Sequence, residues 1–370
     1  MKTLDLTNRT IVVVYMLYFG DMISLSPFLE VLRRAAKGSQ IILVTDVRCR
    51  DAAAANPNVD EIVAVDRRHM GLASTWKLGR KIGKSHPDVL MVLHGTMRTT
   101  ILSMAMRPVC WTGEAGSALG KLFIDRPMLV ERKDCHAAEK YVRFLGGLGV
   151  SDLHYEGMKV YALPEWNEGA RRFYEKAGIG REERIAAFSV GSSTKEKNWP
   201  ASSYGKVADA MAEKGMRPVF FGVESERPMI EEALSGMKHW DRAVIAAGKL
   251  SMGEFIAAAG RASIAFTNDS GPMYVFDSRD VPTIALFGPS NARLHHPLGR
   301  RSCALASTDM PMTQDHVSHT IRDGRYVPVA AIPAGEVLRA ASWALGEGED
   351  PRYESHVYVV PSRQNPGENR

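Results

Sequence analysis

Short apolar runs that alternate with helical patterns constrain the fold of this chain most strongly. Each run has the length and the β-branched content of a buried strand, and a Gly or polar turn commonly follows it. In the first half the predicted strands are 11–17, 41–44, 61–65 and 89–93, and the predicted helices between them are 23–36, 52–55 and 72–82. Strand–helix alternation of this length implies parallel strands joined by right-handed crossovers.

The same alternation restarts in the second half of the chain. Its predicted strands are 184–188, 218–221, 243–246, 263–267 and 283–287, and its predicted helices are 202–213, 225–234 and 252–259. Gly, Pro and polar residues gather at 155–167 and mark the join. We therefore predict an α/β chain of two Rossmann-like, doubly wound parallel-sheet domains that face a cleft, at 1–160 and 161–332. A further helix is predicted at 333–345, and the tail 346–370 is expected to be partly loose.

Length and cysteine content narrow the class of protein. A single core rarely grows beyond about 250–300 residues, so 370 residues fit two domains. The N-terminus lacks the features of a signal peptide, and no apolar run approaches the roughly 20 residues that span a bilayer. We expect a cytoplasmic protein that can touch a membrane without crossing it. The four cysteines are scattered without C-x-x-C spacing, which argues against a disulfide framework or a zinc site: Cys49, Cys110, Cys135 and Cys303.

Charge is distributed unevenly along the chain. The net charge is +5, and residues 1–160 hold 22 Lys and Arg against 16 Asp and Glu, while the remainder is close to neutral. A basic first half suits an anionic partner such as a phosphorylated lipid or a membrane surface. A nucleic-acid partner is not expected, because the surplus is small and no nucleic-acid-binding module is recognisable.

Polar turns at the carboxyl ends of predicted strands are the candidate binding segments, because parallel sheets bind ligands at that edge. Asp21 follows the first strand, where a carboxylate can accept a proton from an attacking hydroxyl or, alternatively, cap a helix. Ser192 and Ser193 begin a loop that also contains Lys195 and Lys197. Hydroxyls and a cation in such a loop bind phosphate oxygens, although the same residues also fit a solvated polar loop.

Two further turns follow strands of the second half. The segment Asn268-Asp269-Ser270-Gly271-Pro272 joins a strand to a helix, and free amides at the start of such a helix bind anions such as a diphosphate. Asp269 can hold sugar hydroxyls in a cleft, and the competing interpretation is a helix cap. Glu226 follows the strand 218–221, where an acidic residue can bind both ribose hydroxyls or simply be solvated.

Several common motifs are absent from the sequence. No P-loop and no G-x-G-x-x-G fingerprint occurs at a strand–helix junction. No D-x-D pair follows a strand, so no metal–diphosphate site is expected. His295 and His296 precede Pro297 in a loop and are interpreted as structural or solvated.

Taken together, these segments resemble glycosyltransferase family 9, the lipopolysaccharide heptosyltransferases. Their order and spacing match along nearly the whole chain. The family implies a GT-B fold and an inverting, metal-independent transfer without a cofactor, usually of a heptose from an ADP-linked donor to a lipid A–Kdo core. The resemblance rests on Gly20-Asp21-x-x-x-Leu25-x-Pro27, on Gly191-Ser192-Ser193 with Lys197-x-Trp199-Pro200, on the turn 222–226, and on Asn268-Asp269-Ser270-Gly271-Pro272-Met273 with Pro282-x-x-x-Leu286-Phe287-Gly288-Pro289.

The resemblance also implies a role for each candidate residue. Asp21 corresponds to the general base, and Lys197 to a cation that grips the diphosphate and assists its departure. The helix 333–345 is expected to pack back onto the first domain. The implied partners are a nucleotide-sugar donor, an anionic lipid-linked saccharide acceptor and the inner face of the inner membrane. The other implied contacts to the nucleotide sugar are Ser192, Ser193, Glu226 at the ribose, Leu250 beside the base, Asp269 facing the sugar, and Ser270 and Gly271 near the phosphates.

One position departs from the family pattern. Tyr274 stands where the family usually has His, and the helix that contains it is more polar than expected. A paralogue that uses a different nucleotide sugar and a non-catalytic donor-binding paralogue are therefore alternatives. A nucleotide-sugar epimerase of the same fold is a further alternative. Asp21, Lys197 and Asp269 argue against a non-catalytic protein, and product analysis with the donor alone distinguishes an epimerase.

Overall fold

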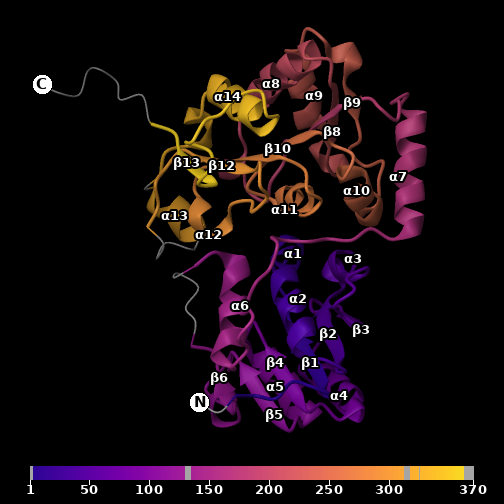
Figure 1. Cartoon of the computed structure of the whole chain (residues 1–370), viewed down its shortest axis with the longest axis vertical. Helices are drawn as coiled ribbons and strands as arrows, with labels where there is room; N and C mark the ends of the chain where they lie inside the picture. Colours follow the sequence, from indigo (N-terminus) through magenta and orange to yellow (C-terminus); the bar gives the residue numbers. More distant parts are fainter. Residues whose placement is uncertain (1–2, 130–134, 312–316, 325, 362–370) are drawn as a thin grey trace, which may run out of the picture. The chain divides into compact units, whose positions relative to one another are not determined.

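The chain forms two compact units, Met1–Tyr161 and Ala162–Arg370, each built around one parallel sheet (Figure 1). The computed structural model describes residues 3–129, 135–311, 317–324 and 326–361. Parallel strands connected through helices confirm the predicted class of two doubly wound α/β units.

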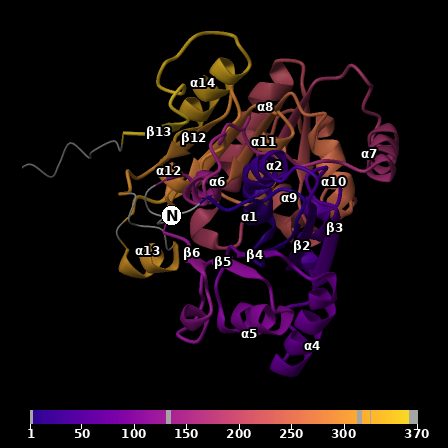
Figure 2. The ribbon, with the colours of Figure 1, turned by 60° about the horizontal axis from the view of Figure 1, so that its bottom comes forward.

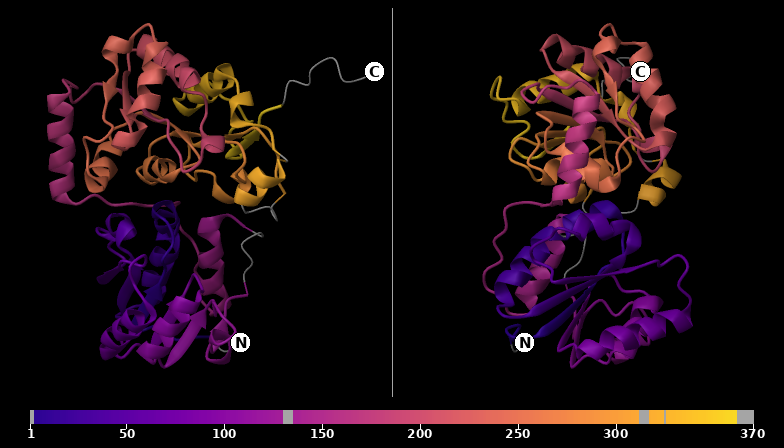
Figure 3. Two further views of the ribbon diagram at one scale, coloured as in Figure 1. Left: turned by 180° about the vertical axis from the view of Figure 1, so that it is seen from behind. Right: turned by 90° about the vertical axis from the view of Figure 1, so that its right-hand side faces the viewer.

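The described part of the first unit contains a six-stranded sheet in the order β3-β2-β1-β4-β5-β6, in which every neighbouring pair is parallel. Helices cover both faces of this sheet (Figure 3, right). Side chains alternate between the faces, so that Val12 packs with Leu102 on one side, while Tyr15 lies against Tyr141 with ring centroids 5.3 Å apart. The elements are β1 (Thr10–Val14), α1 (Phe19–Ser24), α2 (Ser26–Ala35), β2 (Gln40–Asp46), α3 (Arg50–Ala53), β3 (Glu61–Val65), α4 (Leu72–Ile82), β4 (Val89–Val92), α5 (Met97–Met106), β5 (Cys110–Gly113), β6 (Arg126–Pro127) and α6 (Ala137–Gly147).

The helical segment after β1 differs from the single helix predicted at 23–36. Two helices form instead, and Leu25 separates α1 from α2. Pro27 lies in the first turn of α2, where its missing N–H group costs nothing, whereas the interior of one long helix would lose a hydrogen bond there. Helix α1 begins at Phe19, which is earlier than the predicted start at residue 23. Asp21 therefore lies within α1 rather than before it.

The second unit carries, within its described residues, a seven-stranded parallel sheet in the order β13-β12-β11-β10-β7-β8-β9. Phe220, Phe188 and Phe266 lie opposite one another on three neighbouring strands and stack with centroid spacings of 4.9 and 5.0 Å. At one edge of the unit α7 packs against α10 (Figures 1 and 3). The elements are α7 (Pro164–Lys176), β7 (Ile185–Ser189), α8 (Ala201–Glu213), β8 (Arg217–Phe221), α9 (Arg227–Ser235), β9 (Val244–Ile245), α10 (Met252–Ala259), β10 (Ile264–Asn268), α11 (Gly271–Ser278), β11 (Thr283–Phe287), α12 (Ala292–His295), β12 (Cys303–Ala306), α13 (Val317–Asp323), α14 (Ala334–Ala344) and β13 (Val357–Val359).

The C-terminal helix belongs to the second unit, which corrects the expectation that 333–345 packs onto the first domain. The apolar side of α14, including Val337 and Trp343, is buried in the core of the second unit, where the helix contacts α8 and β11. The described part of the tail is also built into this unit. Tyr353 is buried and donates a hydrogen bond from its hydroxyl to Glu336, and β13 extends the sheet beside β12. Residues 362–370 of the predicted loose tail lie outside the described residues.

Each sheet has one point where the order of its strands reverses. In the first unit the reversal lies between β1 and β4, and in the second it lies between β7 and β10. Loops that leave the carboxyl ends of two such strands run to opposite faces of the sheet and leave a crevice in which ligands bind. Asp21 and His94 follow β1 and β4, while Ser192 and Asp269 follow β7 and β10. The topology therefore brings four chemistry-bearing residues to the two ligand-binding edges.

No helix within the described residues is long and apolar enough to cross a membrane.

Candidate functional site

Asp21 lies in the first turn of α1, directly after the loop that leaves β1. Its carboxylate oxygen Oδ2 accepts a hydrogen bond from the Tyr18 N–H group at 3.2 Å, the contact by which a residue in a helix's first turn reaches back to the cap. Among the described residues, no hydrogen-bond donor reaches its Oδ1 atom. The carboxylate is half-buried, so one oxygen anchors the helix and the other remains open to a ligand.

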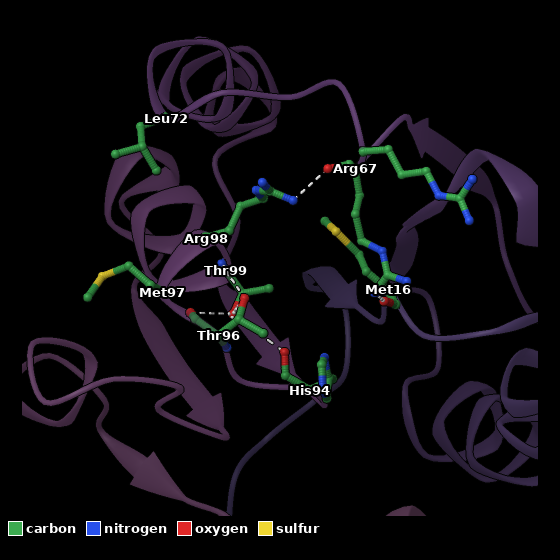
Figure 4. Close-up of a pocket in the computed structure, with 9 residues that line it drawn as sticks. Met16, Arg67, Leu72, His94, Thr96, Met97, Arg98 and Thr99 are labelled. Atoms are coloured by element: carbon green, nitrogen blue, oxygen red, sulfur yellow. Dashed lines mark hydrogen bonds between the residues drawn. The ribbon is translucent and has the colours of Figure 1, made fainter. Parts of the chain in front are cut away.

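A hollow of about 590 Å³ opens at the same edge of the first sheet (Figure 4). Arginine side chains and threonine hydroxyls give it a polar, positively charged wall, while methionine and leucine side chains supply apolar contact. A hollow of this kind suits an anionic saccharide with an apolar attachment. It is lined by Met16, Arg67, Arg68, Leu72, His94, Thr96, Met97, Arg98 and Thr99.

The two arginines that approach each other in this hollow are held by the backbone. The Arg67 guanidinium donates to the Met16 carbonyl at 2.5 Å and lies 3.2 Å from a carboxylate oxygen of buried Asp46. Arg98 donates to the Arg67 carbonyl at 2.6 Å (Figure 4). Hydrogen bonding from Arg48 holds the pKa of Asp46 below its usual range, so this carboxylate stays ionised beside Arg67. The cations are thus pre-positioned, which reduces the entropy lost when an anion binds.

His94 shares this environment. Burial lowers the pKa of its imidazole, and nearby Glu114 and Asp21 partly oppose that shift. The ring is therefore mainly neutral at pH 7. Sequence reasoning did not single out His94, Arg67 or Arg98. Their position in the sequence could have identified the arginines, because Arg67 and Arg68 follow β3 at the carboxyl edge of the sheet, where ligands bind.

In the second unit, the structure brings Lys197 and Asp269 into contact. The Lys197 Nζ atom lies 2.6 Å from Asp269 Oδ2, and the two side chains are only 12% and 10% exposed. Burial alone would raise the pKa of the Asp269 carboxyl, but attraction to Lys197 and to His295 holds that pKa below its ordinary value. Asp269 is therefore a carboxylate at neutral pH, and its charge keeps the lysine beside the reversal between β7 and β10.

Asn268 explains why the two segments meet. Its side chain is fully buried and accepts hydrogen bonds from the Trp199 N–H group and the Tyr204 hydroxyl, each at 3.0 Å. Its amide nitrogen donates to the Val190 carbonyl at 2.8 Å. One asparagine thus joins the end of β10 to both ends of the loop that carries Lys197. Sequence reasoning quoted Asn268 in a motif without assigning it this role.

The serines that follow β7 lie in two different environments. The Ser192 hydroxyl donates to the Thr194 carbonyl at 2.7 Å and lies 2.6 Å from Asn198 Oδ1, so it organises the loop. Ser193 is exposed. A side chain on Gly191 would collide with the Glu226 carboxylate, since a Cβ atom there would lie 1.8 Å from Oε1. Glu226 therefore reaches the serine loop from the end of β8.

The Glu226 carboxylate is anchored through one of its oxygens. Its Oε2 atom accepts a hydrogen bond from the Val223 N–H group at 3.0 Å. Burial raises the pKa of the group, and this hydrogen bond opposes the rise only in part. Leu250 lies half-buried beyond β9, before the cap residue of α10. The role of Leu250 beside a base stays a prediction.

The start of α11 is open to an anion. Gly271 begins the helix, Pro272 occupies its first turn, and no side chain caps the free N–H groups. The Ser270 hydroxyl bonds the Asn268 carbonyl at 3.4 Å rather than the helix. An uncapped helix start next to a lysine is a common phosphate-binding arrangement.

Tyr274, the residue that departs from the family pattern, contacts a histidine that sequence reasoning interpreted as structural or solvated. The Tyr274 hydroxyl lies 3.3 Å from His295 Nδ1. His295 also lies near enough to Asp269 to lower the pKa of that carboxyl. An imidazole therefore borders Asp269, supplied from α12 rather than from α11.

The described residues contain no group of three or more His, Cys, Asp or Glu side chains arranged to hold a metal ion.

Comparison with known proteins gives a consistent family. The model of "Glycosyltransferase family 9 (heptosyltransferase)" matches residues 75–323, more than half of the chain. Lipooligosaccharide heptosyltransferase 2 of Haemophilus influenzae is 24% identical over 300 residues, which cover 77% of this chain and 85% of that protein. A crystal structure of a family 9 glycosyl transferase from Veillonella parvula is 32% identical, with a TM-score of 0.87 over 94% of this chain and 100% of that one.

A more distant structure shares the fold. The E. coli ADP-heptose lps heptosyltransferase II is 17% identical, with a TM-score of 0.74 over 91% of this chain and 99% of that one. The predicted resemblance is confirmed by these comparisons. The chain is a glycosyltransferase and belongs to family 9, the heptosyltransferase family.

Proposed function

We propose that this protein transfers a heptose from ADP-heptose to a saccharide of the lipopolysaccharide core, with inversion at the anomeric carbon and without a metal ion. The single observation that carries the proposal is the enclosed Lys197–Asp269 ion pair beside the open start of α11. The arrangement combines a cation and free amides for a diphosphate with a carboxylate for sugar hydroxyls. The heptosyltransferase relatives support heptose as the sugar.

The donor is proposed to lie across the carboxyl edge of the second sheet. Lys197, Ser192, Ser193 and the amides at Ser270 and Gly271 would hold the diphosphate. Glu226, whose carboxylate accepts a hydrogen bond from the Val223 N–H group, would also accept hydrogen bonds from the ribose hydroxyls. Leu250 would contact the base, and Asp269 would face the sugar. ADP-heptose as the donor follows the name of the E. coli relative.

The acceptor is proposed to occupy the hollow of the first unit. Core saccharides linked to lipid A are anionic, and the Arg67 and Arg98 guanidiniums supply positive charge that is already oriented. Bidentate contact to carboxylate or phosphate groups is the interaction that guanidinium geometry favours. The open oxygen of Asp21 would lie beside the reacting hydroxyl.

The proposed chemistry begins at the acceptor hydroxyl. Asp21 removes the proton of the acceptor hydroxyl while that oxygen attacks the anomeric carbon from the face opposite the diphosphate. The new C–O bond forms as the bond to the diphosphate breaks, and the diphosphate leaves with the electron pair. Lys197 and the amides of α11 stabilise the charge that grows on it. One displacement inverts the anomeric centre.

Mass spectrometry of reactions with several nucleotide sugars and deacylated core saccharide tests the proposal. We expect a heptose mass increment with ADP-heptose and none with hexose donors. Incubation with the donor alone serves as the control, because an epimerase would change the donor without an acceptor. Transfer of a hexose in place of heptose would overturn the assigned donor.

A further inference from the structure

The outer face of α4 and α5 carries a concentration of positive charge. Residues 67–113 contain one acidic residue, Asp88, while the net charge of the whole chain is only +5. The net positive charge of this segment therefore exceeds the net charge of the whole protein. Its basic residues are Arg67, Arg68, Lys77, Arg80, Lys81, Lys84, Arg98 and Arg107.

Helix packing turns the apolar and basic side chains of α4 outward. Gly79 lets α4 approach α5 closely, since a Cβ atom there would lie 2.6 Å from the Ala105 Cβ atom. The opposite face of α4 is therefore exposed, and Leu72 and Trp76 keep 61% and 43% of their surface accessible. Figure 2 shows α4 and α5 side by side on the outside of the first unit.

The exposed face continues from α4 onto α5 and the loop after it. Met97 is 53% exposed and borders the hollow of Figure 4 together with Leu72. At the other end Val109 is 81% exposed and lines a second hollow of about 390 Å³ with Arg80 and Arg107. Apolar and basic side chains thus extend from the proposed acceptor hollow along both helices.

Five of the basic side chains on this face are not neutralised by the protein. Among the described residues, no acidic side chain forms an ion pair with any of Lys77, Arg80, Lys81, Lys84 or Arg107, all of which are exposed. Unpaired cations beside exposed Trp and Leu side chains are typical of protein surfaces that lie on anionic bilayers. The aromatic ring suits the headgroup level, where one edge is apolar and the other hydrated.

We propose that the face formed by α4, α5 and residues 107–109 docks on an anionic bilayer surface and thereby brings the neighbouring hollow to a lipid-linked acceptor. The inference rests on the proposed function for the nature of the acceptor and adds the surface by which the protein reaches it. Electrostatic attraction supplies most of the binding, and Trp76 and Leu72 add apolar burial.

Vesicle co-sedimentation tests the docking surface. The wild-type protein is mixed with vesicles of equal parts phosphatidylethanolamine and phosphatidylglycerol, or with vesicles of phosphatidylcholine alone. The test variant is Trp76→Ser with Lys77→Gln and Lys81→Gln. The matched control is Trp240→Ser with Lys206→Gln and Lys238→Gln, which removes an exposed tryptophan and two exposed lysines from the second unit.

We expect the wild type and the control to bind the anionic vesicles, more weakly as salt is added, and to bind neutral vesicles poorly. Each basic residue removed should lower the partition roughly fivefold, so the test variant should lose binding by more than an order of magnitude. Equal loss in both variants, or wild-type binding that ignores lipid charge, would overturn the proposal. Equal competition by a single-stranded oligonucleotide would also overturn it, in favour of a nucleic-acid surface.

A second readout separates this inference from the proposed function. With deacylated, water-soluble core saccharide, the test variant should transfer sugar at the wild-type rate, because Trp76, Lys77 and Lys81 do not line the hollow. With acceptor embedded in anionic vesicles, its rate should fall with its partition. If wild-type protein binds vesicles but transfers nothing to either acceptor, only the proposed function fails. If transfer from vesicles is unchanged in the test variant, only the docking surface fails.

Discussion

Lys197 Nζ lies 2.6 Å from Asp269 Oδ2, so an almost fully enclosed ion pair spans the reversal of strand order between β7 and β10. The lysine comes from the loop after one strand and the aspartate from the end of the other. Asn268 sets their spacing, because it bonds the Trp199 N–H group two residues beyond the lysine. One local arrangement thus provides both a cation, Lys197, for the leaving diphosphate and a carboxylate, Asp269, for the sugar.

Replacement of Lys197 by Met should weaken nucleotide binding and destabilise the protein. Removal of one partner from a buried pair leaves the other charge uncompensated, at a cost of about 3 kcal/mol or more. Loss of a charged contact to phosphate should weaken ADP binding by at least about tenfold. Calorimetric titration with ADP measures the affinity, and urea unfolding measures the stability. Lys197→Arg retains the charge and serves as the control, and unchanged ADP binding in Lys197→Met would remove the lysine from the donor site.

The ion pair should also set an acid limit for stability. The folded-state pKa of Asp269 lies below its ordinary value of 3.8, so its contribution is present above that value and is lost as the pH falls through the folded-state pKa. In Lys197→Met, the lysine no longer opposes the effect of burial on Asp269, so the pKa of this carboxyl rises. Asp269 should therefore lose its negative charge at a higher pH in the variant than in the wild type. Urea unfolding at a series of pH values below 6 measures the shift. Identical acid profiles for wild type and variant would contradict the assigned coupling.

Replacement of Asp21 by Ala should slow transfer while donor binding survives. General base catalysis is typically worth about 10²–10⁴-fold, and single-turnover measurements should show a loss of that size. Asp21→Asn provides the control for structure, because its amide oxygen can still accept the Tyr18 N–H group that anchors α1. Both variants should therefore lose turnover, while only Asp21→Ala also loses the helix contact. Wild-type turnover in Asp21→Asn would show that the carboxylate is not the base.

Replacement of Glu226 by Gln should separate binding from stability. Burial raises the pKa of this carboxyl above 4.5, so its charged form is disfavoured in the folded protein and the neutral amide removes that cost at pH 7. ADP affinity should fall by roughly 10–100-fold if the carboxylate holds the ribose, while the unfolding free energy stays the same or increases. Glu224→Gln is the control, since Glu224 is exposed and pairs with Arg227. Equal ADP affinity in wild type and Glu226→Gln would exclude the ribose contact.

The parallel sheets were predictable because their strands are short, apolar and regularly spaced. The stacked residues Phe188, Phe220 and Phe266 all fall within strands that local pattern identifies. Residues 97–106 of α5 carried no such signal, since Thr99, Thr100 and Ile101 favour strands, and close packing against α4 at Gly79 decides the helix. The amphipathic pattern of helix α14 was clear in the sequence. That pattern does not show whether the helix packs against the core of the first unit or of the second.

The candidate site was predictable only in part for a related reason. Positions at strand ends identified Asp21, Lys197 and Asp269 one by one, because sheet topology collects such residues at one edge. The pairing of Lys197 with Asp269, and of Tyr274 with His295, joins segments that are distant in sequence. Only the folded arrangement shows which side chains touch. Arg67 and Arg98 donate hydrogen bonds to backbone carbonyls. Every residue type has such a carbonyl, so the sequence does not show which residues accept these bonds.

Mass spectrometry of the product formed from ADP-heptose and deacylated core saccharide, by wild-type protein and by Lys197→Met, tests the proposed heptose transfer directly. We expect one added heptose with the wild type and a greatly reduced yield with the variant. No heptose addition by the wild type, or equal yields from both proteins, would contradict it.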